Sequence, residues 1–381
     1  MPRIDALFGE MPGRRASDLH LVVGRPPLFR ISGEMVESDQ PKLSPDDLKD
    51  LVYDILEPGQ RETIENHLDL DFAYEVRDLA RFRANVFYQQ RGLGAVFRLI
   101  PTRIQTLGEL GMPDVVRKLA EATGGLILVT GPTGSGKSTT LAAMINYINE
   151  TRDAHVLTIE DPLEFIHTPR RCLITQREVG VHTKDFASAL RVSGRQDPDI
   201  ILVGEMRDLE TISLALTSAA CGQLVFGTLH TNSAVKTIDR LIDAYPADEQ
   251  NQVRAMLADC LAGVVAQQLV KTPDGKRCAA VEVLLGGKAL GNIIREGKTS
   301  MIASYMQSGS GEGMQTMDQA LLALVKSGKV KAEDAAVKAN EKALFDRMMA
   351  GDGAQQQRAG MPGSSPGAMP QPAGQRPVAR R

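Results

Sequence analysis

The sequence predicts an α/β protein with a parallel or mixed sheet covered on both faces, preceded by a smaller α+β domain. Two observations carry this prediction. From residue 126 onward, short apolar strands alternate with longer helix-forming segments, which is typical of strands joined by crossover helices. Before residue 101, short runs that alternate between polar and apolar residues indicate half-buried strands. At 381 residues, the chain is long enough for two domains.

Residues 1–100 are predicted to form the α+β domain. A helix is expected from Ser44-Pro45 to Leu56, because serine caps a helix and proline fits its first turn. The strands expected in this domain are 19–23, 28–31, 72–76, 82–87 and 94–99.

Residues 101–350 are predicted to form the larger domain. Its expected strands are 126–130, 156–159, 200–203 and 224–229. Its expected helices are 139–149, 186–194, 209–221 and others beyond Val235. The last segment, 351–381, is mostly Gly, Pro, Gln, Ala and Ser, which buries too little apolar surface to offset chain entropy. We therefore expect a disordered, mildly basic tail, with or without a partner.

The composition is that of an ordinary globular protein, with 43% hydrophobic and 24% charged residues. A net charge of −3 and 4% aromatic residues argue against a nucleic-acid partner, which calls for basic surface and stacking platforms. The four cysteines form no C-x-x-C pair, so reduced thiols are favoured over zinc or disulfides. No apolar run approaches the roughly 20 residues of a membrane span, and the N-terminus does not look like a signal peptide. A cytoplasmic protein is expected.

A glycine-rich loop separates the first strand of the larger domain from its first helix. Residues 131–138 match the phosphate-binding pattern G-x-x-x-x-G-K-[ST] without a mismatch. Such a loop turns backbone N–H groups toward phosphates, while Lys137 reaches the β- and γ-phosphates and Ser138 coordinates Mg²⁺. The sequence therefore predicts ATP and Mg²⁺ as ligands. The residues expected to hold the nucleotide are Gly131, Pro132, Thr133, Gly134, Ser135, Gly136, Lys137, Ser138 and Thr139.

Acidic residues follow two of the predicted strands. Glu205 comes after strand 200–203, where a carboxylate can meet the metal beside the phosphate loop, although Asp is the usual residue there. Glu160, Asp161 and Glu164 come after strand 156–159. Such a cluster suits Mg²⁺, or positions the water that attacks the γ-phosphate. Acidic runs are also common in solvated turns, so both interpretations of this cluster stay open.

A histidine and several arginines complete the set of candidates. His230 follows strand 224–229, a position suited to sensing the γ-phosphate, though a lone histidine is often structural. Arg81, Arg83 and Arg98 lie on predicted strands of the first domain among apolar neighbours. Guanidinium groups grip phosphates and act as arginine fingers from an adjoining domain or subunit. Edge-strand arginines kept for solubility are the alternative.

Taken in order, five segments resemble the retraction ATPases of type IV pili, which belong to the secretion-superfamily ATPases. The segments are 16–21, 131–138, 158–164, 204–208 and 227–231, and the resemblance covers roughly residues 1–345. It implies a PAS-like N-terminal domain joined to a RecA-like ATPase domain, assembled as a homohexamer.

The resemblance also implies a role for each candidate. Glu164 would position or activate the attacking water, and Glu205 would be the Walker-B acid that holds Mg²⁺ together with Ser138. Arg83 and Arg98 would reach the nucleotide, and His230 would belong to the family's His box. The implied function is a motor that couples ATP hydrolysis to pilus retraction and twitching motility. It would work at the cytoplasmic face of the inner membrane on a pilus platform protein, reaching the membrane only through partners.

Three departures leave alternatives open. Gln223 stands where the family usually has a second histidine, and Gly291 replaces an arginine in the C-terminal signature at 289–296. Segment 267–275 resembles the accessory paralogue of the main motor. One alternative is therefore a weakly catalytic or non-catalytic ring member that supports a main retraction motor. Another is a pilus extension or type II secretion ATPase, although those relatives usually carry a tetracysteine zinc site and a longer N-terminal region.

Overall fold

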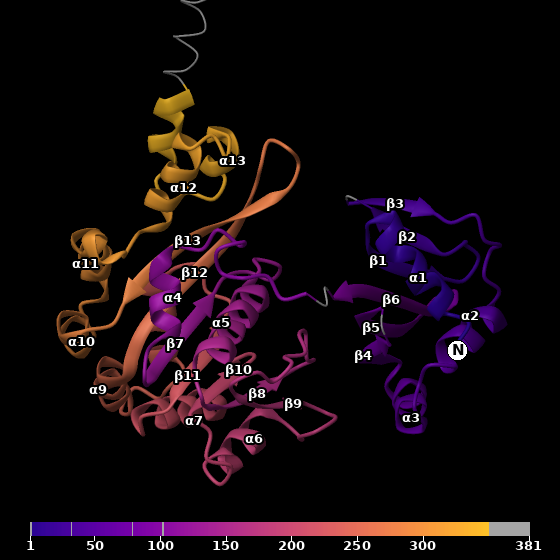
Figure 1. Cartoon of the computed structure of the whole chain (residues 1–381), viewed down its shortest axis with the longest axis horizontal. Coiled ribbons are helices and arrows are strands. Elements are labelled where there is room, and N and C mark those ends of the chain that lie inside the picture. Colours follow the sequence, from indigo (N-terminus) through magenta and orange to yellow (C-terminus); the bar gives the residue numbers. More distant parts are fainter. Residues whose placement is uncertain (1, 32, 78, 101–102, 350–381) are drawn as a thin grey trace, which may run out of the picture.

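The computed structural model describes residues 2–349, except 32, 78, 101 and 102. The tail predicted at 351–381 lies outside the described residues. Within them the chain forms two bodies, each built on its own sheet (Figure 1). The boundary predicted near residue 100 falls between the two sheets and stays a prediction, because residues 101 and 102 are not described.

The smaller body is an antiparallel sheet with the strand order β3-β2-β1-β6-β5-β4, coloured indigo to violet in Figure 1. Its strands are β1 (Ala16–Val22), β2 (Leu28–Ile31), β3 (Glu34–Glu37), β4 (Asp69–Val76), β5 (Ala80–Gln89) and β6 (Gly92–Ile100). Its helices are α1 (Asp5–Arg14), α2 (Pro45–Tyr53) and α3 (Pro58–His67). This is the α+β body that the sequence predicts.

Alternation along β5 gives the smaller body two distinct faces. Phe82 is fully buried on one face, where its ring stacks on Phe8 of α1 with centroids 4.2 Å apart. Arg81 and Arg83 are half-buried on the other face, because residues two apart on a strand point the same way. The arginines of β5 are therefore kept out of the aromatic core.

Two helical details of the smaller body differ from the sequence prediction. The helix expected over 45–56 ends at Tyr53, and α3 begins at Pro58, since proline fits the first turn of a new helix. Helix α1 is not among the predicted elements. The buried side chains of Ile4, which directly precedes the helix, and of Leu7, Phe8 and Met11 within it recur at helical spacing and would have indicated it.

The larger body is a mixed sheet with the strand order β13-β12-β7-β11-β10-β8-β9. All neighbours pair in parallel except β12 and β13. The strands are β7 (Gly125–Thr130), β8 (His155–Glu160), β9 (Leu173–Glu178), β10 (Ile200–Val203), β11 (Leu224–Leu229), β12 (Leu261–Lys271) and β13 (Arg277–Leu285). The helices are α4 (Asp114–Ala120), α5 (Lys137–Thr151), α6 (Phe186–Ser193), α7 (Leu209–Ala220), α8 (Ala234–Asp243), α9 (Gln250–Cys260), α10 (Lys288–Arg295), α11 (Ile302–Ser308), α12 (Met317–Lys326) and α13 (Ala332–Ala336).

Helices cover both faces of this sheet, as predicted. Leu126 and Leu128 of β7 pack into a core shared with α6 to α10, whereas Ile127 and Val129 pack into a second core with α4 and α5. Burial on both faces explains why the strand reads as a continuous apolar run. The predicted α/β fold class is confirmed.

The hairpin of β12 and β13 differs from the prediction of helices beyond Val235. Helices α8 to α13 do form there, but residues 261–271 and 277–285 between α9 and α10 are strands. Periodicity does not separate a buried strand from a buried helix, and this apolar run lies against β7 in the middle of the sheet. The valines at 264 and 265 favour a strand because their β-branched side chains pack well on a pleated surface.

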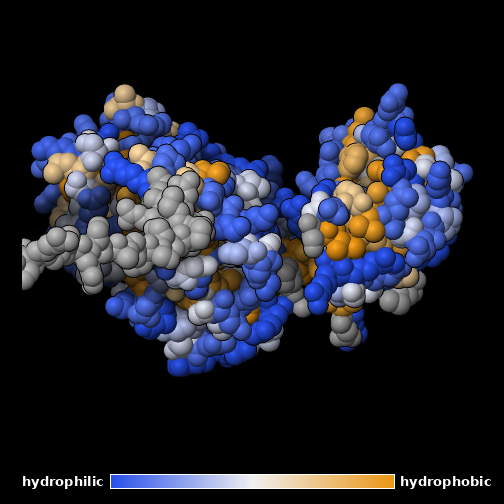
Figure 2. Space-filling model, turned by 90° about the horizontal axis from the view of Figure 1, so that it is seen from above, coloured by the Kyte–Doolittle hydropathy of each residue, from blue (hydrophilic) through white to orange (hydrophobic). Residues whose placement is uncertain are grey.

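The surface seen in Figure 2 is mostly hydrophilic, with an apolar area on the smaller body. Exposed large apolar residues of that body include Met35 and Val36 on the edge strand β3. Among residues 2–349, no helix combines the length and the apolar character needed to span a membrane.

Candidate nucleotide site

The glycine-rich loop lies at the carboxyl end of β7, near the middle of the larger sheet. Because β8, β10 and β11 run parallel to β7, their carboxyl ends reach the same edge. That edge is where open α/β sheets bind ligands. The topology thus brings the segments after four strands to one place, although they are far apart in the sequence.

A pocket of about 300 Å³ occupies this edge. The sequence-predicted residues that line it are Arg83, Thr133, Gly134, Lys137, Ser138, Glu164, Glu205 and His230. Glu160 and Asp161, which the sequence analysis placed in the acidic cluster with Glu164, also line it. The lining residues that the sequence prediction did not assign to the site are Pro162, Phe186, Gly204, Arg207 and Thr228. The predicted loop residues Gly131, Pro132, Ser135, Gly136 and Thr139 belong to the same loop and helix start without lining the pocket.

The loop and the start of α5 suit a phosphate. The helix begins after Gly136, and no side chain caps its N-terminus, so its first N–H groups are free of a side-chain acceptor. Lys137 lies over the loop, where its Nζ donates to the carbonyl oxygens of Gly131 at 2.9 Å and Pro132 at 3.3 Å. Burial lowers the pKa of Lys137, while Glu205 and Glu164 act in the opposite direction. A positive lysine and an uncapped helix both attract an anion.

Glu205 lines the same pocket as the loop and is held by two partners. His230 Nε2 lies 2.8 Å from its Oε1, and Arg207 Nε lies 2.6 Å from the same oxygen. Burial alone would raise the pKa of Glu205, but the hydrogen bonds from Arg207 and His230 outweigh it and lower that pKa. Glu205 is therefore a carboxylate, the form that a hard cation requires.

The residues present fit a magnesium ion bound together with a nucleotide. Ser138 and Glu205 line the same pocket and supply a hydroxyl and a carboxylate oxygen. In the described part of the chain, no group of three His, Cys, Asp or Glu side chains is arranged to hold a metal. Mg²⁺ keeps several waters and takes substrate phosphate oxygens, so one or two protein ligands are enough.

The arginines of the smaller body are placed differently from each other. Arg83 Nη1 lies 4.0 Å from Glu164 Oε1 and lines the pocket. Arg98, its partner across β5 and β6, instead donates from Nε to Asp18 at 2.9 Å and does not line this pocket. Its side chain is 69% exposed, so it is accessible from outside the chain.

Gln267 of β12 is a supporting residue that sequence reasoning missed. Its buried amide accepts from Thr140 Oγ1 at 2.8 Å and donates to the carbonyl oxygen of Ser135 at 2.7 Å. It thereby ties the phosphate loop and α5 to the strand behind them. The sequence does not reveal this role, because Gln267 is more than a hundred residues away from the loop.

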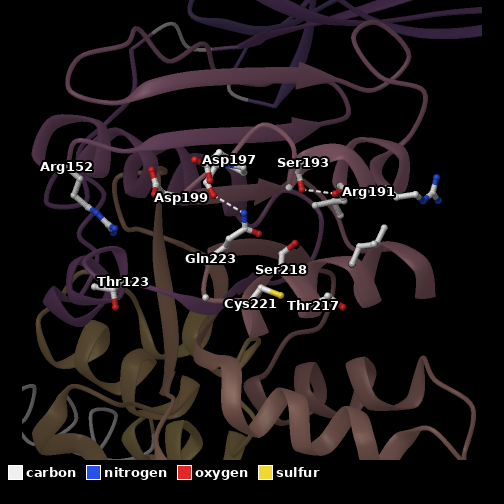
Figure 3. Close-up of a pocket in the computed structure, with 15 residues that line it drawn as sticks. Thr123, Arg152, Arg191, Ser193, Asp197, Asp199, Thr217, Ser218, Cys221 and Gln223 are labelled. Atoms are coloured by element: carbon white, nitrogen blue, oxygen red, sulfur yellow. Dashed lines mark hydrogen bonds between the residues drawn. The ribbon is translucent and has the colours of Figure 1, made fainter.

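Gln223 and Gly291, two of the three positions that depart from the family's pattern, lie outside the nucleotide pocket. Gln223 precedes β11, at the opposite end of that strand from His230, and donates to the carbonyl oxygen of Pro198 at 2.8 Å. It lines a second pocket, of about 620 Å³, at the amino ends of β10 and β11 (Figure 3). Gly291 lies where α10 packs on α9, and a Cβ there would come 2.9 Å from the carbonyl oxygen of Ala258. Gly291 therefore serves close helix packing in this chain.

Glu160 gives a pH-dependent prediction. It lines the pocket, but protein atoms surround its carboxyl group, and this burial raises its pKa to about 7. The nearby charge of Glu164 acts in the same direction. The folded, nucleotide-free protein therefore keeps a proton that the unfolded chain loses near pH 4.5. The corresponding stability is present below pH 4.5 and is lost as the pH rises to about 7.

We expect Glu160→Gln, which mimics the neutral acid, to raise the free energy of unfolding at pH 8 by about 1–3 kcal/mol. At pH 5 the gain is expected to be much smaller, because Glu160 is then protonated in the wild type. Urea unfolding of the nucleotide-free protein at both pH values measures the difference. An equal change at pH 5 and pH 8 would contradict the assigned titration.

Comparison with known proteins agrees with this geometry. A family described as "Type II/IV secretion system protein" matches residues 1–358. The chain belongs to this family. Within the family, it is 52% identical over 324 residues to the type IV pilus retraction ATPase PilT of Pseudomonas aeruginosa, which covers 85% of this chain and 94% of the relative. The resemblance to the retraction ATPases is thereby confirmed.

A second relative and a solved structure of the family add to the comparison. The type IV pilus ATPase PilU of Pseudomonas aeruginosa is 41% identical over 332 residues, 87% of each chain. A crystal structure of the pilus retraction motor PilT with bound ADP superimposes with a TM-score of 0.85 and 44% identity. It covers 91% of this chain and 99% of that one. The chain described here therefore has the fold of that retraction motor.

Proposed function

We propose that this chain is the ATPase motor that retracts type IV pili, hydrolysing ATP to ADP and phosphate. One observation carries the proposal: a single pocket collects the lysine and serine of the phosphate loop, four acidic residues, a histidine and an arginine of the other body. The 52% identity to a pilus retraction ATPase supports the same conclusion.

Each residue has a role that its position supports. Lys137 and the uncapped start of α5 bind the β- and γ-phosphates. Ser138 and Glu205 would hold Mg²⁺, which neutralises charge on the phosphates when bound. Glu164 orients the attacking water and accepts its proton. His230 donates to Glu205 and links that carboxylate to the chain beyond β11.

The arginines and the two bodies account for the coupling to movement. We take residues 1–100 and 101–350 as the two lobes, assembled in a homohexamer. Arg83 contributes positive charge from the smaller lobe of its own chain, and the exposed Arg98 suits the nucleotide of a neighbouring subunit. Binding and cleavage of ATP then change how the lobes face each other, as in hinge-type domain motions.

The partners and the location follow from the proposed activity. The ring would push on a platform protein of the pilus at the cytoplasmic face of the inner membrane and touch the membrane only through that partner. An accessory role beside a second motor is less favoured, because identity is 52% to PilT and 41% to PilU. PilT and PilU come from the same Pseudomonas aeruginosa strain, so such a pair does coexist.

Phosphate release by the purified chain tests the enzymatic part of the proposal. We expect steady ATP hydrolysis by the wild type and loss of at least 100-fold in Lys137→Ala, because electrostatic stabilisation of the phosphates is removed. Lys118→Ala, which changes an exposed lysine of α4, is the matched control and should keep the wild-type rate. An inactive wild type would favour the accessory alternative.

A deletion strain tests the direction of the motor. Cells without this chain should carry many surface pili and fail to twitch. Cells without pili would instead identify an extension ATPase.

A further inference from the structure

An ion pair joins the two bodies beside the nucleotide pocket. Arg81 Nη2 of β5 lies 2.7 Å from Glu178 Oε2, at the end of β9. The side chains are only 16% and 6% exposed, unlike most ion pairs of this protein, which lie at the surface. A charge buried to this degree needs its partner, because an unpaired buried carboxylate is costly. The pair therefore constrains how the smaller body sits on the larger one.

Glu178 carries this constraint to the segment that bears Glu164. The same oxygen that binds Arg81 also accepts a hydrogen bond from the backbone N–H of Leu163 at 3.3 Å. Leu163 is buried and directly precedes Glu164 in the chain. One carboxylate oxygen thus links the smaller body to the backbone beside the proposed water-positioning residue.

Arg83 makes a second contact between the smaller and the larger body. It lies two residues after Arg81 on β5, so both guanidinium groups extend from the same face of the strand. Arg81 contacts Glu178, while Arg83 lies 4.0 Å from Glu164. The docking of one strand therefore controls both the backbone before Glu164 and the charge that faces its carboxylate.

We propose that Arg81 and Glu178 are positioning residues for ATP hydrolysis: the docked smaller body holds Leu163 through them and so places Glu164 against the attacking water. This inference rests on the proposed ATPase function and adds a requirement to it. Movement of the smaller body away from the larger one breaks the Arg81–Glu178 pair and releases the segment around Glu164. Hydrolysis is then confined to the docked arrangement, which couples lobe movement to catalysis within one chain.

Variants of Arg81 in the full-length chain test the proposal. We expect Arg81→Gln to lower kcat for ATP hydrolysis by about 10- to 100-fold, because small displacements of a positioned group have effects of this size. KM for ATP and the affinity for ADP should change by no more than about twofold, since the phosphate loop is untouched. Arg81→Lys should recover part of kcat. Arg25→Gln, which breaks the exposed Arg25–Glu37 pair, is the matched control and should keep the wild-type kcat.

Variants of Glu178 distinguish its ion pair with Arg81 from its hydrogen bond with the Leu163 N–H. Glu178→Gln loses the charge that binds Arg81 but keeps an acceptor for Leu163, whereas Glu178→Leu loses both. We expect the larger fall in kcat for Glu178→Leu. Hydrogen exchange provides a readout besides activity: the Leu163 amide should exchange faster in Arg81→Gln and faster still in Glu178→Leu, while amides of β7 stay protected.

The outcomes are distinct. A wild-type kcat in Arg81→Gln, or unchanged exchange at Leu163, overturns the inference while leaving the ATPase proposal intact. A fall in kcat that is matched by lost ADP affinity and a lower melting temperature also overturns it, because the pair would then be merely structural. An inactive wild type removes the ATPase proposal, and this inference with it.

Discussion

Glu164→Gln is expected to lower kcat for ATP hydrolysis by about 10²- to 10⁴-fold, the usual contribution of a positioned general base. The carboxylate of Glu164 lines the nucleotide pocket and forms an ion pair with Arg83. An amide has the same size but does not take the proton of the attacking water. Because Lys137 and the phosphate loop stay in place, ADP and ATP should bind with nearly wild-type affinity.

Single-turnover phosphate release and fluorescent-nucleotide titration separate these two effects. Glu210→Gln is a suitable control, since that carboxylate is exposed on α7 and pairs with Arg191 away from the pocket. Equal rates for Glu164→Gln and the wild type would remove Glu164 from the mechanism. A loss of nucleotide affinity in parallel with kcat would instead indicate a binding role.

Gly131→Ala is expected to disrupt the phosphate loop and weaken ADP binding by at least 100-fold. A Cβ at this position would lie 2.2 Å from the carbonyl oxygen of Gln267 and 2.6 Å from Ser135 Oγ. The obstacle is the main chain of the buried strand β12, which cannot move aside. The backbone at Gly131 also has a φ of +147°, which disfavours any side chain. Strain and overpacking together should cost about 2–5 kcal/mol of the free energy of unfolding.

Gly134→Ala, in the same loop, tests the effect of the left-handed backbone conformation without a steric clash. Gly134 has a φ of +75°, but nothing lies within 4 Å of a Cβ built there. We therefore expect a loss of only about 1 kcal/mol and largely retained ADP affinity. Urea unfolding and ADP titration of both variants provide the comparison. Similar losses in the two variants would show that the left-handed backbone, rather than the contact with β12, limits the loop.

The elements that the sequence predicted well are those with a local signal. Strand, glycine loop and helix at β7 and α5 follow one another within thirty residues, so their order and chemistry can be read directly. Strands β8, β10 and β11 are apolar runs bounded by turns, and they are confirmed. The strands β12 and β13 were missed because a buried strand and a buried helix have the same apolar composition.

The residues of the candidate site also fall into those with a local signal in the sequence and those without one. The phosphate loop is one contiguous motif, and the acidic segment and His230 each follow a recognisable strand. Gln267 and Glu178 have no such local signal, since each acts on a segment far away in the chain. Arg81 was noticed in the sequence only as a possible phosphate ligand, whereas the structure pairs it with Glu178. Their roles appear only when the contacts are known.

By itself, then, the sequence determined the chemistry available to this chain: a loop that binds phosphate, acids for a cation and a water, and arginines in a separate body. Local backbone preference and short-range spacing are sufficient for that. Only the tertiary structure decided which of these groups meet. The parallel strands bring the ends of β7, β8, β10 and β11 to one edge. The docking of β5 places Arg83 beside Glu164, whereas the pairing of β6 with β1 places Arg98 beside Asp18. The physical reason is that long-range contacts depend on strand order and on burial of the two cores, neither of which is encoded in any single segment.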